Sequence, residues 1–510
     1  MDRDTSSPSQ LRTRLDQPVP FLWRVIGWLS SSILFYTILF ILGGPSEADA
    51  PETVYSTWAI AHGNLSCAYP IAPAHHLVTI ADPFAAAAPL YSILTGIMAA
   101  ILRIGHQVPF PSAAQLGQHC SNGFTSMFQW SMHSGIIVPT IRLSYVVWPI
   151  LAMSVVALLR ANGRGRTGWE SFALIMLSLT SPLYMALVEY FHPQDVLALA
   201  LILFSVAQFQ QNKWMTAGFF MGAALLTQQF TLLAVVPLFF LAPSGGRLRL
   251  AISATGVFLL INVPLLIATS GRAFYAQIFG SSRISAFQST AQYRGGTVLW
   301  ELHLRGLALF LISRLLPILL SALLALWVSR RLGASLTQPG LLLSLLATTF
   351  FLRLVFEENL YGYYFMSVAI FMVLVGIVER RIREALVAWL ALVTLAFNPV
   401  SWGFQSNWTL WGARLSADLP IIAIGIAVAF NLVRLISQRE LKLSRLLWIV
   451  VTVASCVPSL WGRPADTPIL PTWLWQILFV ASGLVLATKS LRQGIERSRQ
   501  LGAAIGELQT

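Results

Sequence analysis

The sequence predicts an all-α fold, a polytopic bundle of transmembrane helices. Hydrophobic residues make up 56% of the 510 positions and charged residues only 10%, whereas soluble proteins contain about 25% charged residues. Apolar runs of about 16–24 residues recur from end to end, enough for a helix to cross a hydrocarbon core of about 30 Å. These runs are too long for the strands of a membrane β-barrel, and they do not alternate with a period of two. We therefore expect about fourteen crossings, within a range of about 11–14.

The basic residues indicate the topology, because they cluster in the short connections between apolar runs. The clusters lie at residues 12–14, 160–166, 247–249, 330–331, 380–383, 439–445 and 489–499. Cytoplasmic loops carry such an excess of lysine and arginine, so both termini are expected in the cytoplasm of a multi-pass plasma-membrane protein. The net charge of +13 then reflects topology, and no nucleic-acid partner is expected.

The expected crossings form a single transmembrane domain over residues 21–510. The first apolar run lacks a cleavage site of small residues, so we expect a retained helix and not a signal peptide. Residues 1–20 and 489–510 are expected to be cytoplasmic tails, and residues 43–135 the long first extracytoplasmic loop. The crossings are expected near residues 22–42, 136–159, 170–188, 195–210, 213–226, 228–242, 250–269, 306–328, 339–356, 362–378, 384–397, 419–437, 446–460 and 472–488.

One apolar segment, residues 83–104, does not fit a topology in which successive connections lie on alternate sides of the membrane. If it crossed the membrane, every later basic loop would face outward and the positive-inside bias would be inverted. We expect a surface-lying or re-entrant helix within the first loop, with a crossing as the alternative. Cys67 and Cys120 flank the segment and would share the oxidising side, where a disulfide can persist. We predict that these two cysteines pair.

A short acidic segment follows the first predicted helix. Glu47, Asp49 and Glu52 lie close together, although the whole chain has only 20 Asp and Glu residues. Carboxylates at a membrane surface are costly unless they face water, a partner or a substrate. We interpret the segment as the edge of an active site; the alternative for Asp49 is an ordinary solvated loop residue.

Other polar groups are predicted on the same side of the membrane. All eight histidines lie on this side or at its boundary. They include a turn at residues 192–195, Arg294 in a later loop, and a stretch of acidic and aromatic residues at 353–364. Ordinary structural roles stay open for some of them. Arg353 and Glu357 are four residues apart and can form a helical ion pair, and aromatic residues near helix ends often form an interface belt.

Motifs for several common activities are lacking from the sequence. No Walker A loop and no G-x-S-x-G elbow occurs, and no G-x-G-x-x-G turn occurs between a strand and a helix. ATP-driven transport and serine hydrolysis therefore lack support. His75, His76, His119 and His133 share the first loop but lack the spacing of metal ligands, so we expect no metal site.

Three places in the chain follow one order. First, Asp49 follows the first predicted helix and precedes Tyr55. Second, His-Pro-Gln-Asp at 192–195 opens a helix and precedes Thr-Gln-Gln at 227–229. Third, residues 353–364 combine an arginine, acidic residues and paired aromatic residues. Over most of the chain this order resembles the GT-C class of integral-membrane glycosyltransferases, most closely glycosyltransferase family 87. That family uses polyprenyl-phosphate sugars to build cell-envelope lipids. It often shows a lysine in its Thr-Lys-Gln motif, which is missing here.

The resemblance implies an inverting transfer of a sugar, mannose first and arabinofuranose second, from a polyprenyl-phosphate carrier to a lipid- or glycan-linked acceptor. Reaction is expected on the extracytoplasmic side, with Asp49 as general base and Glu52 as second choice. The expected ligands of the donor phosphate are Arg353, Arg294, His192, Tyr363 and Tyr364. The expected substrate-binding residues are Tyr55, Trp58, Asp195 and Glu357. No cofactor is expected, because the lipid-linked sugar is itself a substrate.

Two other functions stay open. A lipid-carrier flippase or secondary transporter would tend to show repeated halves and charges near the midplane, and we find no clear repeat in the sequence. A catalytically inactive scaffold of the same fold is the other alternative. The missing lysine at Gln228 keeps that alternative open.

Overall fold

The described part of the chain is helical. A computed structural model describes residues 15–42, 50–65, 68, 89–104, 114–115, 129–130, 136–271, 308, 311–332, 339–356, 362–380 and 389. Within these ranges every regular element is a helix, apart from an isolated antiparallel bridge between Pro18 and Thr167. The four crossings predicted between residues 384 and 488 lie outside the described residues, apart from Trp389.

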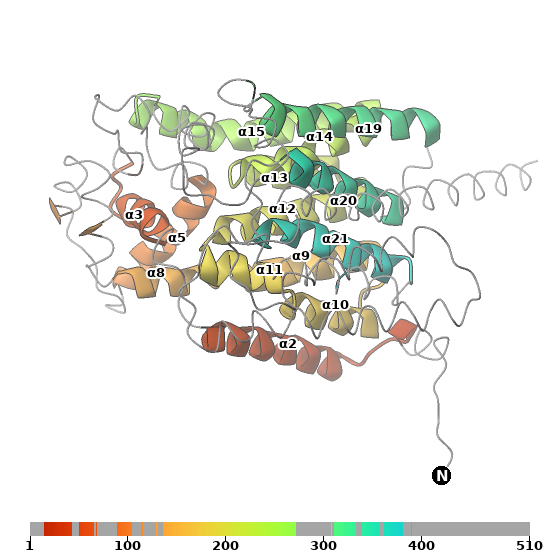
Figure 1. Cartoon of the computed structure of the whole chain (residues 1–510), viewed down its shortest axis with the longest axis horizontal. Helices are drawn as coiled ribbons and strands as arrows, with labels where there is room; N and C mark the ends of the chain where they lie inside the picture. Colours follow the sequence, from red (N-terminus) through yellow and green to blue (C-terminus); the bar gives the residue numbers. More distant parts are fainter. Residues whose placement is uncertain are drawn as a thin grey trace, which may run out of the picture.

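The helices form one bundle, in which the longer ones lie side by side along one axis (Figure 1). They are α2 (Phe21–Leu42), α3 (Ala50–Ala61), α5 (Pro89–Ile104), α8 (Ile137–Ser144), α9 (Val147–Ala161), α10 (Gly168–Ser178), α11 (Ser181–Tyr184), η1 (Met185–Glu189), α12 (Pro193–Gln210), α13 (Trp214–Leu225), η2 (Gln229–Thr231), α14 (Leu232–Leu241), α15 (Ser244–Ala268), η4 (Leu311–Leu315), α19 (Leu316–Leu332), α20 (Pro339–Phe356), η6 (Gly362–Tyr364) and α21 (Phe365–Val378).

Several of these helices suit a membrane protein. In the described residues, 5 helices are long and apolar enough to cross a bilayer, or 6 if a bent pair counts as one span. The unbent spans are Phe21–Leu42, Ile137–Ala161, Pro193–Gln210, Ser244–Ala268 and Leu311–Arg330. The structure therefore supports a helical membrane protein, while the figure of about fourteen crossings stays a prediction.

The predicted span at 170–188 is broken. It consists of Gly168–Ser178 and Ser181–Val188, which meet at an angle of 55°. Pro182 stands in the first turn of the second piece, where its missing N–H costs no helical hydrogen bond. The chain then continues into the π-helix η1. This bend directs residues 181–189 toward the turn that opens α12.

The spans predicted at 213–226 and 228–242 form a hairpin of short helices, α13 with 12 residues and α14 with 10. The break falls at Gln228, whose backbone is extended (φ −157°, ψ 142°). Helix α13 approaches α15 closely through Gly218 and Gly222. A Cβ at either glycine would collide with the backbone oxygen of Leu250 or Ala254. Small residues permit such close helix packing in membranes.

Helices α3, α5 and α8 gather at one end of the bundle (Figure 1, left). The apolar segment predicted within residues 83–104 forms α5, which packs mainly against α3 and α8. The N–H of Leu90 at its start donates to the carbonyl of Leu226, at 3.1 Å. This bond ties the small helices to the hairpin of α13 and α14.

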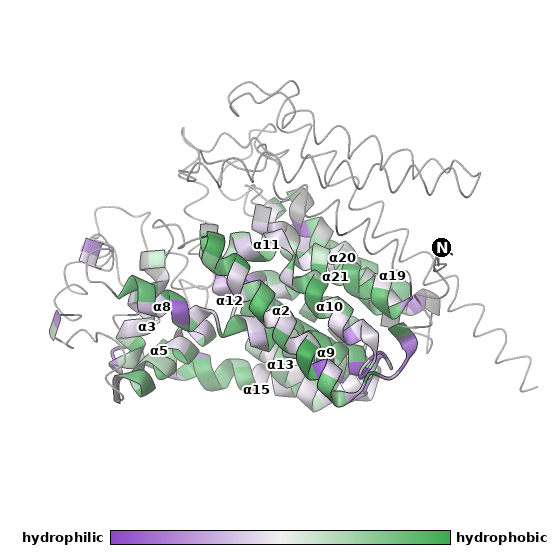
Figure 2. Cartoon of the chain, turned by 90° about the horizontal axis from the view of Figure 1, so that it is seen from below, coloured by the Kyte–Doolittle hydropathy of each residue, from purple (hydrophilic) through white to green (hydrophobic). Residues whose placement is uncertain are grey.

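A buried carboxylate connects several segments at the opposite end of the bundle. Glu170, in the first turn of α10, is 1% exposed and accepts from Arg24 at 3.2 Å and from Arg160 at 3.4 Å. Its other oxygen accepts from the backbone N–H of Arg166 at 2.5 Å. Figure 2 shows a hydrophilic stretch at this end, away from α3 and α5. The contacts join the start of α2 to the connection between α9 and α10.

A second carboxylate extends this network. Asp16 lies 3.7 Å from Arg164 and 3.4 Å from Arg380, and it accepts from the indole N–H of Trp169 at 3.0 Å. Burial, followed by the nearby charge of Arg380, lowers the pKa of Arg164, while Asp16 opposes this. The N-terminal segment, the loop before α10 and the end of α21 are therefore held together by ion pairs.

The same end collects further helix termini. The side chain of Asn162, after α9, donates to Gln210 at the end of α12, at 2.8 Å. Glu379, after α21, lies beside Gly340 at the start of α20. The ends of α12 and α21 and the start of α20 therefore lie at the ionic end. The starts of α12 and α21 and the end of α20 lie at the opposite end of the bundle, with α3, α5 and α8.

We predict that Glu170→Gln lowers the free energy of unfolding by about 3–5 kcal/mol, because it leaves the mostly buried guanidinium of Arg24 without its anion. Arg160→Gln is the matched control: Arg160 is 52% exposed, and removing such a partner costs about 1 kcal/mol or less. Thermal unfolding of both variants in lipid nanodiscs measures the difference. Equal losses would contradict this role for Glu170.

Candidate functional site

The turn between η1 and α12 is the centre of the candidate site. Phe191 has a left-handed backbone (φ 52°) and His192 follows directly. The N–H of His192 donates to the carbonyl of Ala186 at 2.5 Å, and that of Tyr190 to Met185 at 3.0 Å. Phe191 is 0% and His192 4% exposed. The backbone thus fixes three neighbouring aromatic rings inside the protein.

Tyr363 joins this turn from a distant part of the sequence. Its ring stacks on the imidazole of His192, with centroids 4.7 Å apart and an interplanar angle of 16°. It also contacts Tyr190, at 5.1 Å between centroids. Tyr363 belongs to the single turn η6 before α21, so the start of α21 and the start of α12 meet here.

Arg353 adds a positive charge beside these rings. The guanidinium carbon of Arg353, near the end of α20, lies 4.3 Å from the ring centroid of Tyr364 and 4.8 Å from that of Phe230. Tyr364 contacts Tyr363 edge to face, at 4.5 Å between centroids. A cation held between aromatic faces is attracted by their quadrupoles. Arg353 is therefore placed by rings of η2 and η6.

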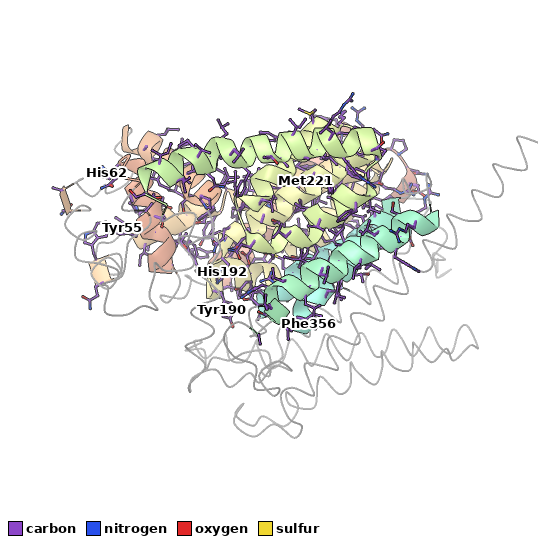
Figure 3. All side chains as sticks on the ribbon, turned by 90° about the horizontal axis from the view of Figure 1, so that it is seen from above. Tyr55, His62, Tyr190, His192, Met221 and Phe356 are labelled. Atoms are coloured by element: carbon purple, nitrogen blue, oxygen red, sulfur yellow. The ribbon has the colours of Figure 1, made fainter. Side chains whose placement is uncertain are left out.

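Four of the predicted phosphate ligands are thus neighbours in space: His192, Arg353, Tyr363 and Tyr364. Figure 3 labels Tyr190, His192 and Phe356, the last residue of α20, at the same end of the bundle. Asp195 lies in the first turn of α12 and is 5% exposed. Arg294, the fifth predicted phosphate ligand, and Glu357, predicted to bind substrate, lie outside the described residues.

The start of α3 reaches the same turn. Ala50, its first residue, forms a buried cluster with Ile141 of α8 and Phe191. Asp49, the predicted base, precedes Ala50 in the sequence and lies outside the described residues. Glu52, the second choice, is the third residue of α3. The predicted cysteine pair also falls outside the described residues, at Cys67 and Cys120.

Tyr55 and Trp58, predicted to contact the sugar, are packed between the small helices, with 1% and 0% exposed. The indole N–H of Trp58 donates to the hydroxyl of Thr140 at 2.8 Å, and Tyr55 contacts Trp130 edge to face at 5.8 Å. Burial raises the pKa of Tyr55. In this arrangement both rings support α3, and their contact with a sugar stays a prediction.

Two features of the site were not predicted. Phe230 holds one side of Arg353, and its only sequence signal is its place directly after the break at Gln228. Hydroxyl groups also bond across the small helices: Thr57 to Thr95 at 2.8 Å, and Tyr91 to Ser144 at 2.5 Å. Residues spaced by four lie on one helix face, so the repeated Ser and Thr of α3 and α5 are the signal for this network.

The arrangement suits the binding of an anion. A guanidinium presents a planar fork of donors to phosphate or carboxylate oxygens, and imidazole and phenol groups can add donors beside it. The N-terminus of α12, which begins directly after His192, favours a negative charge. All of these groups lie at the end of the bundle that carries α3.

Comparisons with known proteins give no independent assignment. No family model matches the chain, and no curated protein matches it significantly. The candidate site is therefore defined by its own residues: His192, Arg353, Tyr363 and Tyr364.

We predict that the ring of Tyr364, and not its hydroxyl, stabilises Arg353. Tyr364→Leu should lower the free energy of unfolding by about 0.5–2 kcal/mol through loss of the cation–π contact, whereas Tyr364→Phe keeps it. A double-mutant cycle with Arg353→Met in lipid nanodiscs isolates the coupling. Zero coupling between Tyr364→Leu and Arg353→Met would show that the contact contributes nothing.

Proposed function

We propose that the chain is an inverting GT-C glycosyltransferase similar to family 87. It transfers a sugar, mannose as first choice and arabinofuranose as second, from a polyprenyl phosphate to a lipid- or glycan-linked acceptor. The observation that carries the proposal is the convergence of His192, Arg353, Tyr363 and Tyr364. The resemblance assigns these four residues to the donor phosphate, and they come from three separate segments of the chain.

The donor is a phosphodiester anion on an apolar tail that stays in the bilayer. Arg353 would bind the phosphate oxygens through its fork of N–H groups, in charge-assisted hydrogen bonds. His192 and the hydroxyls of Tyr363 and Tyr364 supply further donors. These contacts strengthen as the phosphate gains negative charge in the transition state, which is where binding accelerates a reaction.

The acceptor hydroxyl needs a base. Asp49 precedes Ala50, and Ala50 lies in one buried cluster with Phe191, the neighbour of His192. In the proposed reaction the carboxylate of Asp49 takes the proton of the acceptor hydroxyl while that oxygen bonds to the anomeric carbon. The bond from that carbon to the phosphate oxygen breaks, and the polyprenyl phosphate leaves with the electron pair. One displacement inverts the anomeric centre.

The basic residues also indicate which end of the bundle faces the cytoplasm in the proposed enzyme. The end with Arg24, Arg160, Arg164 and Arg380 faces the cytoplasm, following the positive-inside bias. The end with α3, α5, α8 and His192 then faces outward. A lipid-linked donor would reach that end sideways from the outer half of the bilayer.

Asp49→Asn should lower transfer by about 10²–10⁴-fold, because the amide cannot accept the proton. The measurement uses purified enzyme in nanodiscs with a radiolabelled polyprenyl-phosphate mannose and a glycolipid acceptor. Glu47→Gln, in the same acidic segment, is the matched control and should keep its activity. Full transfer activity of Asp49→Asn would contradict the assignment of Asp49 as the base. Loss of activity in Glu52→Gln alone would assign that role to Glu52.

The outward orientation predicts a labelling pattern. Gln115→Cys, within the first loop, and Lys213→Cys, between α12 and α13, place single exposed thiols in a background without native cysteines. A membrane-impermeant maleimide should label the first in intact cells and the second only after permeabilisation. The reverse pattern would contradict the assignment of the two ends.

A further inference from the structure

His192 is held by the residue two positions after it. The Nε2 atom of Gln194 lies 3.1 Å from the Nδ1 atom of His192. Both side chains are buried, with 4% of His192 and 1% of Gln194 exposed. Stacking on Tyr363 fixes the plane of the imidazole as well. One face and one nitrogen of the ring are therefore already engaged by the protein.

With the amide oriented so that its nitrogen faces the ring, this contact indicates where the imidazole carries its proton. The NH2 group of an amide only donates, so the Nδ1 atom that faces it accepts. A neutral imidazole has one N–H group, which must then be at Nε2. We propose that Gln194 is a positioning residue that holds His192 as the Nε2–H tautomer. The consequence for catalysis rests on the proposed function: His192 presents an N–H donor to the phosphate of the sugar carrier.

The other end of the amide points to a ligand. The Oε1 atom of Gln194 is buried and accepts no hydrogen bond from any group in the described part of the chain. Buried polar atoms are nearly always satisfied in proteins, by water or a ligand where the protein offers no partner. A hydroxyl of the transferred sugar is a donor of the right chemistry. Gln194 would then link the sugar to the phosphate-binding imidazole.

The protonation state can be read without any activity assay. The full chain, labelled with 15N-histidine, is studied by solid-state NMR in lipid bilayers, and His192→Asn identifies the signals of His192 by difference. We expect a pyridine-type 15N shift for Nδ1 and a pyrrole-type 15N shift for Nε2. A proton on Nδ1 in the unmodified protein would overturn it.

Gln194→Glu supplies the matched reversal. An ionised carboxylate accepts and cannot donate, so at a pH where the introduced carboxyl group is ionised the Nδ1 atom of His192 should carry a proton. Gln208→Glu places the same charge near the other end of α12 and should leave the signals of His192 unchanged. If Gln194→Glu keeps the Nε2–H tautomer, Gln194 does not set it.

Transfer activity separates this inference from the proposed function. If both hold, Gln194→Glu should lower kcat by about 10²-fold through loss of a donor to the developing charge, while Gln208→Glu should not. If the unmodified chain shows no transfer from any donor lipid, the proposed function fails. The NMR result then still decides the role of Gln194.

Discussion

The turn at Tyr190–His192 is the constraint on which the rest of the site depends. Phe191 adopts a left-handed backbone, which costs an L-residue with a side chain about 1–2 kcal/mol. Its ring is fully buried, and burying a phenylalanine contributes about 1.5–3 kcal/mol. Packing thus compensates for the strained turn. Phe191 meets α3 and α8 through Ala50 and Ile141, while His192 meets η6 through Tyr363.

The two ends of the bundle are built from different interactions. One end is held by ion pairs centred on Glu170 and Asp16, which join segments far apart in the sequence. The other end joins its segments by aromatic rings around Arg353 and by hydroxyl bonds among α3, α5 and α8. Lipid gives little hydrophobic drive for helix association, so polar bonds and close packing must supply it. The bundle therefore has one ionic end and one end built from aromatic and hydroxyl contacts.

Much of the helical layout could be predicted from apolar run length. The predicted span at 22–42 matches α2 to within one residue, and the one at 339–356 matches α20. An apolar run of that length satisfies its backbone hydrogen bonds in a bilayer by forming one helix. The break between the short helices α13 and α14 also falls where the predicted spans 213–226 and 228–242 divide. The bend near residue 180 was not predicted, because it depends on packing against neighbouring helices, which run length does not encode.

The candidate site was predictable in part. Position at the ends of apolar runs placed His192, Arg353, Tyr363 and Tyr364 on one predicted side of the bilayer. Their grouping around a donor phosphate came from the family resemblance. Neither Phe230 nor Gln194 was expected to hold a neighbour, since an apolar ring and an amide carry no distinctive signal in sequence. Trp58 shows the converse limit: its residue type suits a sugar, but its packing is decided by Thr140 and the helices around it.

The central claim is that the start of α3 and the turn before α12 meet. Chemical cross-linking tests it most directly, with Ala50→Cys and Phe191→Cys in a chain whose native Cys67, Cys120 and Cys456 are replaced by alanine. Both positions are buried, so oxidation to a disulfide, which needs no bulky reagent between the thiols, should join them within one molecule, as seen by mass spectrometry of the linked peptides. Thr57→Cys with Thr95→Cys, whose hydroxyls lie 2.8 Å apart in the native chain, is the positive control. Cross-linking of the control pair alone would contradict the account.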